Sequence, residues 1–92
     1  MTLPLRTAVL NEIHKMNVLS IDEAMMKLKE TYETEGQFNR SAFVGHFMAL
    51  EANGLVELET YELNSENELN LIYKITNDGI DIAQKYISKK YR

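Results

Sequence analysis

The first part of the chain repeats apolar residues at the three- and four-residue spacing of amphipathic helices. One stripe covers residues 5–16, with Thr2 as its candidate N-cap. A second covers residues 20–32, where Ser20 and Glu23 have the spacing of a capping box. The pattern predicts helices over about 4–16 and 20–32, joined by a short extended link and followed by a polar turn that contains a glycine.

The third apolar stripe has a well-marked start and end. Asn39 suits the N-cap, and Phe38 before it can pack on Phe43 as a hydrophobic staple. The stripe ends at Asn53-Gly54, where a glycine can take the left-handed conformation that closes a helix. We therefore expect a third helix that ends at Asn53.

After Gly54 the apolar residues alternate, as they do in a half-buried strand. Two such stretches, 55–60 and 69–75, predict a β-hairpin with its tip near residues 64–67. A register that keeps apolar residues on one face gives the pairs Val56–Ile75, Leu58–Tyr73 and Thr60–Leu71, with Glu57 opposite Lys74.

The last segment begins with Thr76-Asn77-Asp78-Gly79, a helix start, and continues its apolar stripe to Tyr91. The predicted order is thus three helices, two strands and a final helix over about 76–90. This is an α+β fold, mainly α, in a single domain over residues 1–92.

The outline resembles the winged helix-turn-helix superfamily, and within it the MarR and PadR type of transcriptional regulator. Two segments carry the resemblance, Leu50-Glu51-Ala52-Asn53-Gly54-Leu55-Val56-Glu57 and Tyr73-Lys74-Ile75-Thr76-Asn77-Asp78-Gly79. The resemblance implies a helix-turn-helix over about 20–53, a wing over 55–75, and a third helix that enters the major groove of DNA.

The charge distribution departs from that type of regulator. The net charge is −4, and residues 31–80 hold only Arg40 and Lys74 as bases against nine acidic residues. The wing carries five glutamates and its tip has no base, so phosphate would repel it. The basic residues gather instead in the tail, as Lys85, Lys89, Lys90 and Arg92.

If the chain binds DNA, we expect the contacts at the start and on the small-residue face of the third helix. The candidate residues are Gln37, Asn39, Arg40, Ser41, Gly45 and His46. Arg40 can read guanine and the first-turn amides can meet a phosphate. Three of these residues have a purely structural alternative. Arg40 can be a solvated base near Glu35 or Glu51, Asn39 can serve only as a cap, and His46 can be a partly buried packing residue.

The last helix carries more apolar residues than it needs to pack one side against the rest of the domain. Ile82, Tyr86 and Tyr91 are candidates for a homodimer contact, and packing on the first helix is the alternative. The acidic wing favours a second function, a protein-interaction module that meets a basic partner without binding DNA. The basic tail can contact phosphates or simply complement the negative end of its helix.

The sequence argues against several other classes. It has no cysteine and no apolar run of about 18 residues, so we expect a cytoplasmic protein that does not contact a membrane. Its two histidines lack a nucleophile or a metal-ligand spacing, and its glycines form no phosphate-binding loop. We therefore expect no enzyme activity, no metal and no cofactor.

Overall fold

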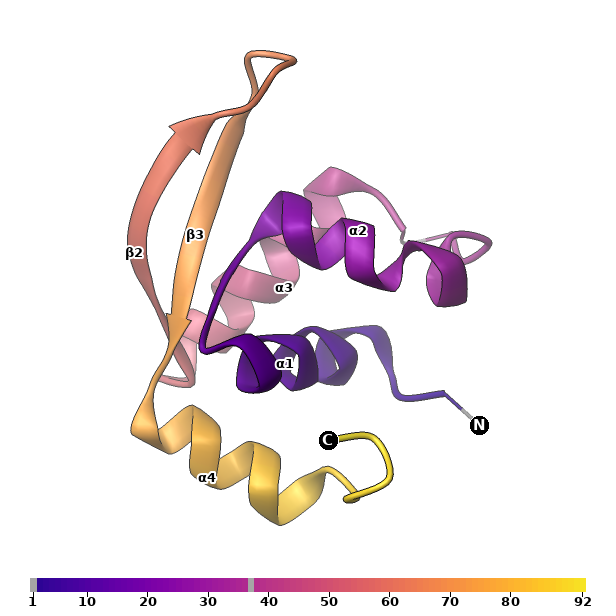
Figure 1. Ribbon diagram of the computed structural model, residues 1–92, viewed down its shortest axis with the longest axis vertical. Helices are drawn as coiled ribbons and strands as arrows, with labels where there is room; N and C mark the ends of the chain where they lie inside the picture. Colours follow the sequence, from indigo (N-terminus) through magenta and orange to yellow (C-terminus); the bar gives the residue numbers. More distant parts are fainter. Residues whose placement is uncertain (1, 37) are drawn as a thin grey trace.

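A computed structural model of the chain describes residues 2–36 and 38–92, and they fold as a winged helix (Figure 1). In chain order the elements are α1 (Leu5–Met16), β1 (Val18–Ser20), α2 (Ile21–Tyr32), α3 (Arg40–Ala52), β2 (Val56–Leu63), β3 (Leu69–Ile75) and α4 (Asn77–Tyr86). The β2–β3 hairpin is the wing. It extends past the helices at one end of the molecule, and α4 lies at the other end (Figure 1).

The helices begin where the sequence supplies caps. The hydroxyl of Ser20 accepts from the backbone N–H of Glu23, whose carboxylate in turn accepts from the Ser20 N–H, so the capping box is confirmed. Asn39 caps α3 by accepting from the N–H of Ala42. The prediction for α1 was wrong: Pro4, not Thr2, occupies the N-cap position, and no side chain caps that end.

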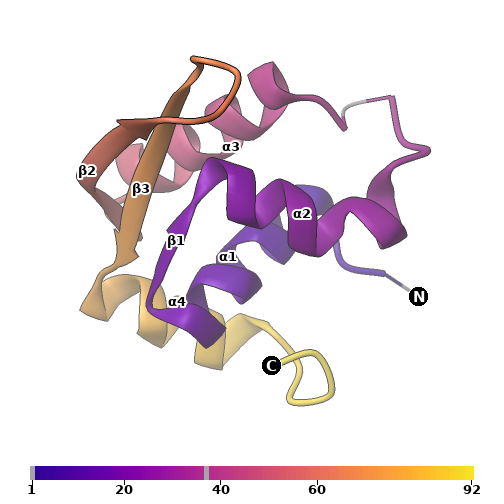
Figure 2. The ribbon, with the colours of Figure 1, turned by 45° about the horizontal axis from the view of Figure 1, so that its top comes forward.

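The sheet is antiparallel in the order β1-β3-β2. The short extended link expected before α2 is β1, and it lies beside β3 (Figure 2). At the base of the hairpin the predicted pairs Val56–Ile75, Glu57–Lys74 and Leu58–Tyr73 are confirmed.

Further along, the hairpin register shifts by one residue. The partner of Thr60 is Ile72, not Leu71 as predicted, because an irregularity between Leu58 and Thr60 places Glu59 as an extra residue in β2. Such a β-bulge sets two residues of one strand against one of the other. From there to the tip, Tyr61 lies opposite Leu71 and Leu63 opposite Leu69.

The core lies between the helices and the base of the sheet. The rings of Phe47 and Tyr73 stack at 4.8 Å between centroids and join α3 to β3. Phe43, on the same side of α3, meets Phe38 edge-to-face at 5.2 Å, which confirms the staple. These residues anchor α3 so that its opposite side faces outward.

Two glycines are needed where the end of α3, the base of the wing and the start of α4 meet. Gly54 has φ +74° and lets the chain turn from α3 into β2, as the sequence predicted. Gly79 lies in the first turn of α4, where a Cβ would come within 2.1 Å of the Leu55 carbonyl oxygen. The hydroxyl of Thr76 accepts from the Gly79 N–H and donates to the Gly54 carbonyl oxygen at 2.6 Å.

The last helix is shorter than predicted. It ends at Tyr86, because Ile87 takes an extended conformation with ψ 123° and buries its side chain. The expected stretch to residue 90 is therefore wrong, and Tyr91 lies beyond the helix in a turn. The amide of Asn11 donates to the Tyr91 carbonyl oxygen at 2.8 Å, which ties this turn to α1.

Candidate nucleic-acid interface

The exposed side of α3 carries small and apolar side chains. Ser41, Gly45, Met48 and Ala52 are exposed, at the spacing of one helical face. A Cβ added at Gly45 would meet no atom within 4 Å, so the space in front of that residue is open. This face of α3 has no carboxylate until Glu51 in its last turn, and a flat surface can approach it closely.

Arg40, at the start of α3, is held by the protein itself. Its guanidinium forms an ion pair with Asp22 on α2 and donates to the backbone oxygen of Leu69 at 2.9 Å. A second carboxylate, Glu68, lies 3.9 Å from the guanidinium nitrogen that meets Asp22. The alternative partners expected from the sequence, Glu35 and Glu51, were wrong. Because Asp22 and Glu68 lie beside it and only 23% of its side chain is exposed, Arg40 presents a partly neutralised charge.

The partner of Arg40 has a shifted pKa. Burial alone would raise the pKa of the Asp22 carboxyl, but hydrogen bonds from Arg40 and Asn64 and the charge of Arg40 together hold it below its usual value. Asp22 is therefore ionised at neutral pH, and the ion pair at the start of α3 is complete.

The wing tip joins the same cluster. The Asn64 amide donates to Asp22 at 3.0 Å, and its oxygen accepts from the backbone N–H groups of Glu66 and Glu68. Asn70 accepts from the Asp22 N–H and donates to Glu62. Through these bonds the tip is fixed against the starts of α2 and α3, and it brings glutamates rather than bases to this end of the interface.

Arg6 is a base beside α3 that the sequence did not indicate. It lies on α1 and is exposed, and its Nε–H donates to Nδ1 of His46 at 3.1 Å. Forty positions separate the two residues, so no local pattern could have joined them. Two arginines thus contact α3 or its start, and among the described residues Arg6, unlike Arg40, has no carboxylate within 4 Å.

His46 faces inward. It is 8% exposed and its ring lies 6.2 Å from that of Phe43, edge-to-face. Burial, and then the charge of Arg6, lower its pKa. A neutral ring with Nδ1 as acceptor fits the bond from Arg6, so the position suits the packing role rather than a contact with a partner.

The remaining candidates divide between surface and cap. Ser41 and Gly45 lie on the exposed face of α3, and Asn39 is exposed while its side chain is engaged as the cap. Gln37 falls outside the described residues. Lys74 lies opposite Glu57 in the sheet, but within residues 2–36 and 38–92 the two form no ion pair within 4 Å.

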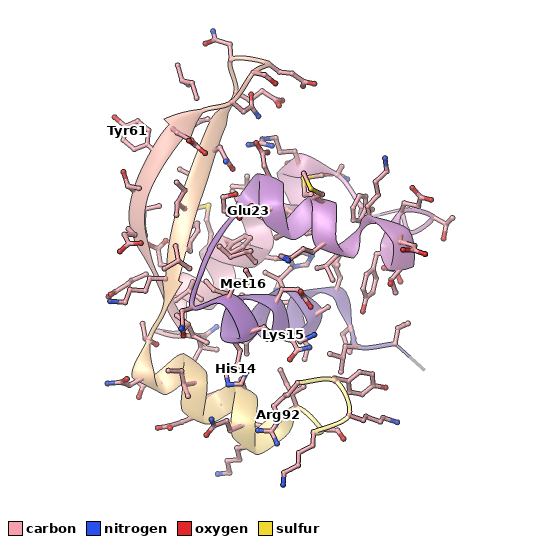
Figure 3. The ribbon with its side chains drawn as sticks, in the orientation of Figure 1. His14, Lys15, Met16, Glu23, Tyr61 and Arg92 are labelled. Atoms are coloured by element: carbon pink, nitrogen blue, oxygen red, sulfur yellow. The ribbon has the colours of Figure 1, made fainter. Side chains whose placement is uncertain are left out.

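The dimer candidates and the basic tail lie far from the wing tip. Tyr86 is 68% exposed on α4, whereas Ile82 and Tyr91 are partly buried against the core. Arg92 lies near the end of α4, opposite the wing tip (Figure 3). Of the four tail bases, only Lys85 is in the last turn of the helix, so the others are not placed at its negative end.

The described residues hold neither a metal-binding cluster nor a membrane-spanning helix. No group of three or more His, Cys, Asp and Glu side chains there is arranged to hold a metal ion. None of the helices in that part of the chain has the length and apolar character needed to cross a membrane.

Comparison with known proteins gives a structural likeness and no sequence family. The chain matches no protein-family model and no curated protein. Its fold is similar to the crystal structure of a candidate transcriptional regulator from Thermoplasma acidophilum, with a TM-score of 0.62 and 19% identity. The match covers 90% of this chain and 80% of the other. At this identity the likeness supports the winged-helix fold alone.

Proposed function

We propose that the protein is a small winged-helix transcriptional regulator, of the MarR or PadR type, that contacts DNA through the exposed face of α3. The observation that carries the proposal is the surface around Gly45, which is open and lined by small residues, with Arg40 at the start of the helix and Arg6 bonded to the neighbouring His46. In helix-turn-helix proteins the second helix of the motif lies in the major groove.

In this mode of binding the wing contributes few contacts with DNA. Its five glutamates face solvent, and Glu66 and Glu68 stand at the tip without a base of the wing beside them. Phosphate contacts come instead from Arg6, from Arg40 and from the first-turn amides of α3. Few phosphates are neutralised in this way, so affinity for random DNA is low, and base contacts from Ser41 add affinity only at a preferred sequence.

A second candidate function is a protein-interaction module that does not bind DNA. The pairing of Arg40 with Asp22 favours it, because that bond satisfies the base nearest the start of α3 inside the protein. For the DNA-binding regulator we further propose that it works in the cytoplasm without catalytic activity. It pairs with a second copy of the chain through the exposed Tyr86 on α4.

The test is fluorescence anisotropy with a short labelled duplex at low salt, using two substitutions at one position. Gly45→Gln and Gly45→Glu differ only in charge and project into open space. We expect wild-type dissociation constants of about 10⁻⁴–10⁻⁶ M for random DNA. Gly45→Glu should weaken binding at least about tenfold more than Gly45→Gln, because a carboxylate in the groove meets phosphate and base acceptors.

Lys74→Ala serves as the control, since Lys74 lies on the wing opposite Glu57. Its affinity should stay within about twofold of wild type. Equal affinity of the two Gly45 variants would exclude α3 as the contact, and no binding by the wild type at several hundred micromolar would favour the interaction module.

A further inference from the structure

The outer strand of the wing has an exposed apolar face, and we propose that it binds an extended segment of another protein in which apolar and basic side chains alternate. The exposed apolar side chains are Leu58, Tyr61 and Leu63 on β2 and Leu69 on β3. Tyr61 and Leu63 are 63% and 62% exposed. Figure 3 shows Tyr61 projecting from β2 away from the helices.

The bulge at Glu59 gathers these residues on one face. Side chains in a regular strand alternate, so Leu58 and Tyr61, three positions apart, would point to opposite faces. The extra residue, Glu59, compensates for this odd spacing. Tyr61, opposite Leu71, therefore lies on the same face of the hairpin as Leu58, opposite Tyr73. The apolar face that begins in the core at Tyr73 therefore continues past the helices to Leu63.

The other face of β2 is acidic. Glu57 and Glu62 point to it, and Thr60 lies between them. An added strand places its side chains beside those of β2 on the same two faces. The complement of this pattern is a strand with apolar residues on one face and lysine or arginine on the other.

The backbone of β2 is able to accept such a strand. β2 is at the edge of the sheet, and within the described residues it pairs with β3 only. Every residue from Glu57 to Leu63 is exposed. The bonds of Asn64 to Asp22 and of Arg40 to Leu69 hold the wing in place before a partner arrives, which lowers the ordering cost of binding.

The same charges argue against a second copy as the occupant. Two β2 strands paired edge to edge bring their glutamates together, and like charges directly opposite are destabilising. The glutamates on an exposed edge thus select a basic partner and discourage self-association.

The experiment is an NMR titration of the ¹⁵N-labelled protein with a short synthetic peptide in which lysine alternates with valine or isoleucine. We expect shifts at the backbone amides of residues 57–63 and none in α1 or α4. Two control peptides, one with the same residues in block order and one with glutamate for lysine, should bind at least about threefold more weakly. Equal binding of the block peptide, or shifts spread over the whole surface, would overturn the proposal.

Two variants locate the contact. Tyr61→Ser should weaken peptide binding about twofold to fivefold, the loss expected for one aromatic cross-strand contact. Glu62→Gln keeps an acceptor for Asn70 and removes one charge, and it should weaken binding in low salt more than in high salt. Unchanged affinity in both variants would overturn the proposal, and so would a concentration-dependent dimer abolished by Tyr61→Ser. DNA affinity should be unaffected by either change, which separates this result from the test of α3.

Discussion

Replacing Gly79 with alanine should destabilise the protein, although alanine is the better helix former. In the first turn of α4, a Cβ at this position would lie 2.1 Å from the Leu55 oxygen, 2.7 Å from Cγ1 of Ile75 and 3.0 Å from the Leu55 carbonyl carbon. Ordinary contacts begin near 3.4 Å. The backbone of α4 must therefore move by more than 1 Å from the turn at Leu55, or the turn must move.

The expected cost follows from what that movement breaks. Overpacking of this kind costs about 1–3 kcal/mol, and the N–H of Thr76 would lose its bond to the Leu55 oxygen, about 1 kcal/mol more. The higher helix propensity of alanine offsets about 1 kcal/mol of this loss of stability. Gly79→Ala should thus destabilise the protein by about 1–3 kcal/mol.

Urea unfolding followed by circular dichroism measures the change, and Gly45→Ala is the matched control. Gly45 is also helical, but its added Cβ meets no atom within 4 Å, so the control should gain up to about 1 kcal/mol. The two substitutions should therefore shift the urea midpoint in opposite directions with equal slopes. A Gly79→Ala protein as stable as wild type would refute the close packing of α4 on Leu55.

Three further predictions concern the helices. Because burial and the charge of Arg6 lower the pKa of folded His46 below its ordinary value of 6.5, the unfolded chain binds this proton more readily. Stability present above about pH 6.5 should therefore fall as the pH drops below that value, and His46→Gln should flatten that fall in urea unfolding. Asn39→Ala should cost about 0.5–2 kcal/mol in urea unfolding, since the N–H of Ala42 loses its acceptor, and no loss would mean the cap is replaced by water. Tyr86→Glu should halve the mass seen by light scattering if α4 forms a dimer contact; an unchanged mass would remove α4 from the interface.

The parts of the fold that the sequence predicted are those fixed by residues close together in the chain. The capping box of Ser20 and Glu23, the Asn39 cap and the left-handed Gly54 each act within a few positions, and all are confirmed. The hairpin register was right where apolar residues alternate regularly. It failed beyond Leu58, because the residues around Glu59 include no glycine or other local sign of a bulge.

The surroundings of α3 depend on contacts between distant segments and could not be read from the sequence. Arg40 meets Asp22 from 18 positions away, and Arg6 meets His46 across 40 positions. The acidic character of the wing was visible as composition, but its attachment to the start of α3 through Asn64 required the structure. Arg6, unlike Arg40, has no carboxylate within 4 Å among the described residues, so the proposed DNA contact rests more on Arg6.

The salt dependence of DNA binding tests the central proposal most directly. Each neutralised phosphate lowers the slope of log K against log salt by about 0.9, so contacts limited to Arg6 and Arg40 predict a slope near −2. Arg6→Ala should bring the slope to about −1, and Lys74→Ala should leave it unchanged. A wild-type slope of about −5 or steeper would contradict the account, because it would require several phosphate contacts from bases other than Arg6 and Arg40, such as those of the tail.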